Sequence, residues 1–142
     1  TSIRSRQNQM TLRLPIYYTE HFKTKPSKTS LAGMNLYRNA HHFLQNAMKK
    51  HFQELVLEQL PPVEQQLKQF TVNYKIYYKS PVCDGSNIVA LIEKFYLDAI
   101  KTHGLIPDDS VNYHLGSTWE VAGQNKADPH VEITIKEYHV TD

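Results

Sequence analysis

Hydrophobic and polar residues alternate near the start of the chain, and this period of two predicts a half-buried β-strand. In MTLRLPIY, residues 10–17, every second position is apolar. Pro15 places this strand at a sheet edge, or ends it, because proline has no amide hydrogen to donate. The next segment, TEHFKTKPSKTS at residues 19–30, is polar and basic and predicts a loop.

Apolar residues then recur every three or four positions, which is typical of an amphipathic helix from about Met34 to Leu57. The stripe consists of Tyr37, Ala40, Leu44, Ala47, His51 and Leu55, widened by Phe43, Met48 and Phe52. Pro61 and Pro62 end this helical region. A second helix is predicted from about Asn87 to His103, with Gly104 as its C-terminal stop.

Three more strands complete the pattern. Residues 69–79 alternate strongly, and residues 111–121 and 130–140 follow the second helix, joined by the turn-rich AGQNKADP. The order is β-α-β-α-β-β. The economical fold is an α/β (α+β) arrangement, a four-stranded mixed sheet with two main helices, because each element then buries one apolar face. The length of 142 residues and the hydrophobic content of 40% predict a single domain over residues 1–142.

Composition narrows the functional classes. The 16 Lys and Arg and 14 Asp and Glu leave a net charge of +2, so any nucleic-acid surface has to come from local segregation of charge. No apolar run approaches the roughly 18 residues that span a bilayer, and TSIRSRQNQ has no apolar signal core. The single cysteine, Cys83, excludes an internal disulfide framework. We therefore expect a cytoplasmic protein without membrane contact.

Acidic residues frame the second predicted helix. Asp84 precedes it, and the pair Asp108 and Asp109 follows it. Helix capping and turn chemistry account for such residues in many proteins, and a divalent-metal site is the alternative. The helix is about 24 Å long, so the spacing alone does not bring the acids together. A shared metal site would require the segment after Gly104 to double back, or the following strand to run past Asp84.

The segment DGSN, followed by KFYLDAIKTHGLIPDDSVNY, resembles the RusA-like crossover junction endodeoxyribonucleases of phages and prophages. That family has an acidic turn with an asparagine, a helix with a lysine and then Asp-Ala, a glycine, and an Asp-Asp pair before a strand. LAGMNLYRNAHHFLQNAMKKHF is similar in character, so the resemblance covers most of the chain. It implies a Mg²⁺-dependent homodimeric enzyme that cuts four-way (Holliday) or branched DNA, with Mn²⁺ as a substitute for Mg²⁺.

The resemblance also implies individual roles. Asp84 and Asp109 would hold the metal ion, with Asp108 beside them. Lys94, four residues before Asp98, would be the catalytic lysine, which stabilises phosphate charge or positions the water. Carboxylate oxygens are the ligands that Mg²⁺ and Mn²⁺ prefer.

The chain departs from the family pattern at two points. Family members often carry a second aspartate where Ser86 stands, and the helix is about one turn longer between Asn87 and Lys94 than in the shortest members. Ser86 or Asn87 would then bind the ion through oxygen, directly or through water. A catalytically impaired DNA- or protein-binding module of the same fold is therefore an alternative, and a structural or host-interaction protein is a third.

Other residues have both a functional and an ordinary interpretation. Lys23, Lys25 and Lys28 in the predicted loop, with Arg38 on the first helix, form a candidate DNA-binding set, and solvated surface charge is the alternative. Lys49 and Lys50 could add to this set, and Tyr17, Tyr18 and Phe22 could stack on opened bases.

The remaining candidates have simpler expectations. Lys94 could be a solvated helix residue, Asp98 one member of a helix-face ion pair, and Asn87 a helix cap. His41 and His42 point about 100° apart on a helix, which is poor geometry for one metal ion. Trp119 is expected in the core or at an interface, and Cys83 as a small packed residue.

Overall fold

The computed structural model describes residues 9–63, 66–81, 84–108 and 112–138. Its elements, in chain order, are β1 (Gln9–Pro15), β2 (Tyr17–Glu20), β3 (Lys28–Leu31), α2 (Met34–Asn39), α3 (His42–Gln59), β4 (Phe70–Tyr78), α4 (Gly85–His103), β5 (His114–Gln124) and β6 (His130–Glu137). Four strands form one sheet in the order β1-β6-β4-β5, and β2 pairs with β3 in a separate hairpin. Strands β4 and β5 are parallel and the other neighbours are antiparallel. The predicted α+β class with a four-stranded mixed sheet is confirmed.

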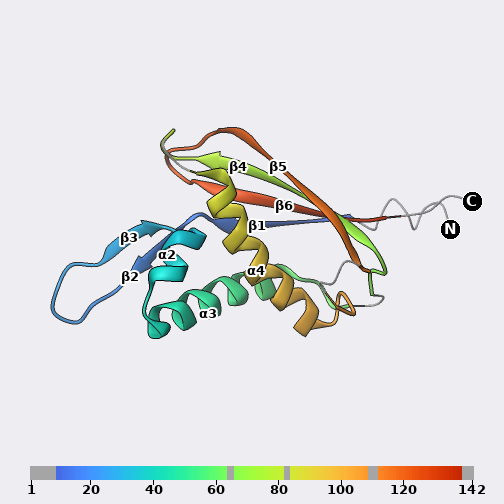
Figure 1. Cartoon of the computed structure of the whole chain (residues 1–142), viewed down its shortest axis with the longest axis horizontal. Coiled ribbons are helices and arrows are strands. Elements are labelled where there is room, and N and C mark those ends of the chain that lie inside the picture. Colours follow the sequence, from blue (N-terminus) through green and yellow to red (C-terminus); the bar gives the residue numbers. More distant parts are fainter. Residues whose placement is uncertain (1–8, 64–65, 82–83, 109–111, 139–142) are drawn as a thin grey trace, which may run out of the picture.

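The helices pack on one face of the sheet (Figure 1). In β4 the residues Phe70, Val72, Tyr74 and Ile76 are buried, while the residues between them are half-buried or exposed. They join the buried residues of β1, β6, α3 and α4 in one hydrophobic cluster. None of the helices in the described ranges is long and apolar enough to cross a membrane.

Helix α4 links β4 to the parallel strand β5, so it runs back along the sheet between them (Figure 1). Both of its ends are fixed by local chemistry. Asp84 caps the first turn, and Gly104 adopts a left-handed φ of 91°, which glycine tolerates without steric cost. The predicted helix over residues 87–103 and its glycine stop are confirmed, with the start two residues earlier.

The prediction of one continuous helix from Met34 to Leu57 is wrong, because the helix is broken near its start. Ala40 and His41 are extended, with ψ values of 150° and 149°, and they separate α2 from α3. The break is stabilised by side chains: the His41 ring accepts a hydrogen bond from the Phe43 amide at 3.3 Å, and Gln45 donates to the Tyr37 carbonyl at 2.6 Å. The apolar period continues across the break, so periodicity alone predicted one helix.

The predicted loop over residues 19–30 is also partly wrong, because its ends form the hairpin of β2 and β3. The two strands are only four residues long, and the hydroxyls of Thr19 and Thr29 are hydrogen-bonded across them at 2.8 Å. Figure 1 shows the hairpin projecting away from the sheet. The hairpin is polar and rich in lysine, so its sequence lacks the hydrophobic alternation from which strands are predicted.

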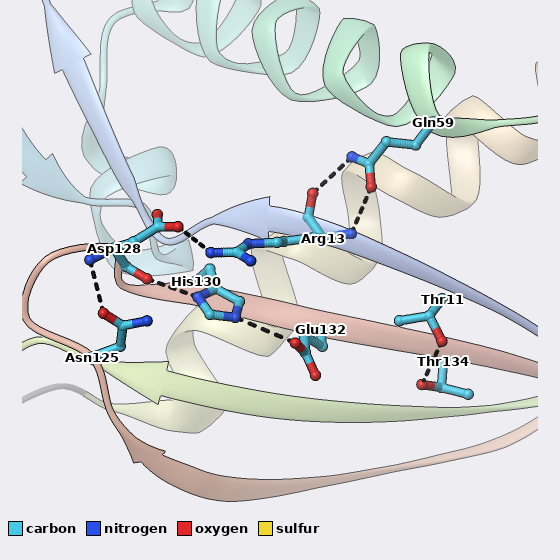
Figure 2. A network of polar contacts seen from close by, with 8 residues as sticks. All are labelled: Thr11, Arg13, Gln59, Asn125, Asp128, His130, Glu132 and Thr134. Carbon is cyan, nitrogen blue, oxygen red and sulfur yellow. Dashed lines mark hydrogen bonds and ion pairs between the residues drawn. The ribbon is translucent and has the colours of Figure 1, made fainter.

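The β1 edge of the sheet is blocked by a side chain from α3. The Arg13 amide donates to Oε1 of Gln59 at 2.8 Å, and Nε2 of Gln59 donates to the Arg13 carbonyl at 2.7 Å, so the side-chain amide takes the place of a neighbouring strand (Figure 2). The Arg13 guanidinium pairs with Asp128, whose backbone carbonyl lies 2.7 Å from Nδ1 of the buried His130. Pro15 ends this strand, as expected.

A buried hydroxyl network joins α4 to the centre of the sheet. The Tyr74 hydroxyl donates to Oε2 of Glu93 at 2.6 Å and lies 2.8 Å from the Tyr96 hydroxyl. Tyr74 and Tyr96 are fully buried. Burial is the main reason that the pKa of each phenol is raised above its ordinary value, because the interior disfavours the phenolate.

We predict that Tyr74→Phe lowers the free energy of unfolding at neutral pH by about 1–3 kcal/mol, because Tyr96 and Glu93 lose a buried partner. Above about pH 10 the unfolded tyrosines lose protons while the folded ones keep them, so stability falls as pH rises, by about 1.4 kcal/mol per pH unit for each tyrosine. The variant should therefore lose less stability than the wild type between about pH 10 and 11. Urea unfolding at several pH values measures this. The control is Tyr138→Phe, at an exposed tyrosine, and equal alkaline losses in both variants would contradict the prediction.

Candidate functional site

Asp84 lies at the N-terminus of α4, the end that follows β4. Its Oδ1 accepts a hydrogen bond from the Asn87 amide at 3.3 Å and another from the Ser86 hydroxyl at 2.9 Å. Asp84 and Ser86 are exposed. The site therefore presents one carboxylate and one hydroxyl to solvent, next to the positive end of the helix dipole. Both are hard oxygen donors of the kind that Mg²⁺ prefers.

Asn87 attaches α2 to this end of α4. Its Oδ1 accepts a hydrogen bond from the Asn35 amide at 2.8 Å. A Cβ atom on Gly33 would lie 2.0 Å from Nδ2 of Asn87, so only glycine fits this contact. The Asn87 amide is thus engaged in holding two segments together, a role that sequence reasoning missed.

The hairpin of β2 and β3, which carries three lysines, is rooted near the same end of α4. Gly33 follows β3, so the hairpin is rooted beside Asn87, and Nζ of Lys79 lies 5.7 Å from the ring centre of Tyr17 in β2. Lys23, Lys25 and Lys28 are exposed on the hairpin. We call these three residues, with the hairpin that bears them, the basic arm. Its tip is stiffened by Lys25, whose Nζ lies 4.6 Å from the ring centre of Phe22.

The α2 side of the site carries two more predicted residues. Arg38 is exposed on α2, and Lys94 is exposed on α4 with its Nζ 5.9 Å from the ring centre of Tyr37. Lys94 follows Asp84 by ten residues, which is about 15 Å along a helix axis, so it lies well apart from the carboxylate. Asp98 pairs with Lys49 of α3 at 3.8 Å, so its ion pair joins two helices.

Asp108 lies at the opposite end of α4. Its Oδ1 is 3.2 Å from Nζ of Lys101 in the last turn of that helix. Lys101 follows Asp84 by 17 residues, or about 25 Å of helix. The structure therefore does not bring Asp84 and Asp108 of one chain to a common metal ion. Asp109 and Cys83 lie outside the described residues.

No three His, Cys, Asp or Glu side chains among residues 9–63, 66–81, 84–108 and 112–138 are grouped so as to hold a metal ion. That search does not include Asp109, since residues 109–111 are not described. A complete metal site around Asp84 thus requires oxygen ligands beyond those that the described residues place there.

Trp119 lies at the Asp84 end of α4. It is 45% exposed and lies on β5 beside Gly85, where an added Cβ would come within 2.4 Å of Cζ3 of the indole. Because Gly85, the first residue of α4, has no side chain, the indole ring of Trp119 can pack against the helix start. Neither this contact nor the exposure of the ring follows from the alternation of β5 in sequence.

A separate cavity of about 370 Å³ lies over β4, β5 and β6. It is lined by Thr71, Val72, Asn73, Gly116, Ser117, Thr118, Thr134 and Lys136. These residues belong to the first half of β4 and its neighbours, whereas Asp84 follows the other end of β4. The cavity is therefore not part of the Asp84 site.

Comparison with known proteins does not assign the chain to a family. No family model and no curated protein matches the sequence. The geometry around Asp84 and the resemblance of its motif to RusA-like nucleases remain as the indications of function.

We predict that Gly85→Ala displaces the Trp119 ring. Alanine normally stabilises a helix by up to about 1 kcal/mol relative to glycine, but here its Cβ would occupy the space of the indole. The chain has one tryptophan, so its fluorescence emission reports the displacement directly. The control is Gly116→Ala, where an added Cβ meets nothing within 4 Å. An emission spectrum unchanged by Gly85→Ala would show that the contact is absent in solution.

Proposed function

We propose that the protein is a homodimeric, Mg²⁺-dependent endonuclease that cuts four-way or branched DNA by phosphodiester hydrolysis. One observation carries the proposal: the exposed Asp84 carboxylate stands at the end of α4 where the basic arm is rooted through Gly33 and Asn87. A phosphate backbone held by the arm would thus pass close to an oxygen ligand for a metal ion. The resemblance of DGSN and the following helix to RusA-like nucleases supports the same reaction.

Each residue at this site has its own role in the proposed reaction. Asp84 and the Ser86 hydroxyl would hold the ion, which would supply activation of water and neutralisation of charge on the phosphate. The first turn of α4 points its amide dipoles toward a bound phosphate. Asn87 keeps α2 and the arm in position, because its oxygen bonds the Asn35 amide. Lys94 and Arg38 extend the positive surface along the DNA, away from the reacting bond.

Dimerisation follows from the substrate. A four-way junction has two equivalent strands to cut, and one chain has one Asp84. Two copies related by a twofold axis provide two symmetric sites.

A DNA-binding module without cleavage is the second candidate. It is favoured by the position of Asp108, which pairs with Lys101 about 25 Å along α4 from Asp84, and by Ser86 where family members often have an acid. Such a module would keep the arm and its affinity for branched DNA. Cleavage of a synthetic four-way junction with Mg²⁺ or Mn²⁺ distinguishes the two candidates, because only the nuclease yields nicked products.

We predict that Asp84→Asn lowers junction cleavage about 100-fold or more and preserves junction binding, because it removes the charge that holds the metal. Asparagine also caps helices well, so folding should be unchanged. Cleavage is followed on a labelled junction with Mg²⁺, and binding by gel shift with Ca²⁺. Asp98→Asn on the same helix is the control and should remain active. Full activity of Asp84→Asn would refute the metal site, and binding without cleavage by the wild type would favour the module.

We predict that replacing Lys23, Lys25 and Lys28 together by alanine weakens junction binding and reduces its dependence on salt. Each lost phosphate contact removes about 0.9 from the slope of log affinity against log salt, so the slope should fall by up to about 3. Fluorescence anisotropy over a salt series measures both. The matched control replaces Lys75, Lys126 and Lys136, three exposed lysines outside the arm, and an equal effect in the control would show that the arm is not the binding surface.

A further inference from the structure

The cavity over β4, β5 and β6 has a volume of about 370 Å³. Pockets for small molecules have volumes of about 300–1,000 Å³, so this one is large enough for a ligand. Its lining side chains on β4 and β6 alternate with the buried residues of those strands, and those on β5 are paired with the lining residues of β4. The hollow therefore lies on the face of the sheet away from the helices.

Gly116 leaves space at one side of this cavity. It is paired with Thr71, and Thr71 is paired with Lys136 on its other side, so these three residues form a row across the sheet. A Cβ atom added to Gly116 would meet nothing within 4 Å. The pairing of β4 with β5 also shifts its register between Phe70 and Thr71, next to this row. Glycine inside a strand and a local shift of register are both frequent where a ligand approaches the backbone.

A second row across the sheet holds hydrogen-bonding groups in set positions. Nδ2 of Asn73 donates to Oγ1 of Thr118 at 2.9 Å, which leaves the hydroxyl hydrogen of Thr118 for a ligand. On the β6 side, the hydroxyls of Thr134 and Thr11 lie 3.3 Å apart (Figure 2). The row therefore presents polar groups that neighbouring side chains already orient.

The cavity has one positive charge. Lys136 is exposed and is the only charged residue among the described ones that line it. Within the described parts of the chain, its ammonium group forms no ion pair. Glu132 of β6 lies four residues away, or about 13 Å along the strand, and it is opposite Lys75 of β4. The charge of Lys136 is thus available to an anionic ligand.

We propose that this cavity binds a small organic monocarboxylate. The carboxylate accepts hydrogen bonds from the Lys136 ammonium and the Thr71 hydroxyl, and the apolar body of the ligand lies over Gly116 and the threonine methyl groups. This site goes beyond the proposed nuclease, since binding requires neither DNA nor metal. Failure of either proposal leaves the other standing.

The charge and the backbone favour a carboxylate over a phosphate. Phosphate sites typically combine arginine with backbone amides at a helix N-terminus. The described lining has no arginine and no helical residue. The backbone of β4 is paired with strands on both sides, so its amides are already hydrogen-bonded within the sheet. One lysine matches the single charge of a carboxylate.

A set of three related probes tests the class of ligand. Naphthylacetate, its neutral analogue naphthylacetamide and naphthyl phosphate are titrated into the wild-type protein, and amide chemical shifts are followed by NMR. Naphthylacetate should shift the amides of Gly116, Thr118 and Lys136 and bind at least about tenfold more tightly than the neutral analogue, because a charged hydrogen bond is lost in the latter. Equal binding of these two probes, tighter binding of the phosphate, or no binding of naphthylacetate up to about 10 mM overturns the proposal.

Two variants with matched controls test the location. Gly116→Val should abolish binding because its side chain fills the hollow, whereas Gly123→Val on the same strand should not. Gly123 lies outside the cavity, and at both glycines an added Cβ meets nothing within 4 Å, so both variants should fold.

Lys136→Met should weaken binding of naphthylacetate at least about tenfold and leave binding of the neutral analogue unchanged. The control is Lys75→Met, at an exposed lysine on the same face of the sheet, and it should bind as the wild type does. Lys136→Met also tests the site if Gly116→Val does not fold. Equal losses in Lys136→Met and Lys75→Met, or full binding by Lys136→Met, would show that the carboxylate is not held at this cavity.

Discussion

The parallel pairing of β4 with β5 determines where the acidic residues of the motif lie. A parallel neighbour can only be reached by a crossover, so α4 has to return along the sheet before β5 begins. Asp84 therefore stays where β4 ends, and Asp108 is carried to where β4 starts. The hydrophobic face of α4, packed on β4, makes this separation rigid. The two acids of one chain are consequently held at opposite ends of α4.

The buried side of α4 explains how a polar site is held on a small domain. Phe95 stacks on Phe52 of α3 with 5.6 Å between ring centres, and it forms a T-shaped pair with Tyr37 of α2 with 5.5 Å between ring centres. The three helices thus share one aromatic contact beneath the exposed charges. Polar groups at the start of α4 need not supply folding energy themselves, because apolar burial of this kind is the main stabilising term.

Sequence periodicity predicted the elements whose pattern is strongest. The alternation over residues 69–79 predicted β4, and the stripe with Gly104 predicted α4, because each of these elements buries a regular apolar face. It failed at Ala40 and His41, where two helices keep one period across an extended break, and at the hairpin, whose short strands bury little. Asp84 was predicted at the helix start, and the structure places it there.

The rest of the site depends on contacts that no linear pattern records. Asn87 meets Gly33 from a segment more than 50 residues earlier, and Gly85 meets Trp119 from the next strand. Both contacts depend on the absence of a side chain on glycine, which gives no periodic signal. The distance between Asp84 and Asp108 depended on strand direction, and that direction was not encoded in the alternation of either strand.

The contact between Asn87 and Gly33 also has a mechanical consequence. Gly33 ends the segment that leaves the hairpin, and Asn87 lies in the first turn of α4, whose backbone amide binds Asp84. The two segments approach too closely for even a methyl group between them. The base of the hairpin and the first turn of α4 therefore cannot slide past one another while this contact is kept.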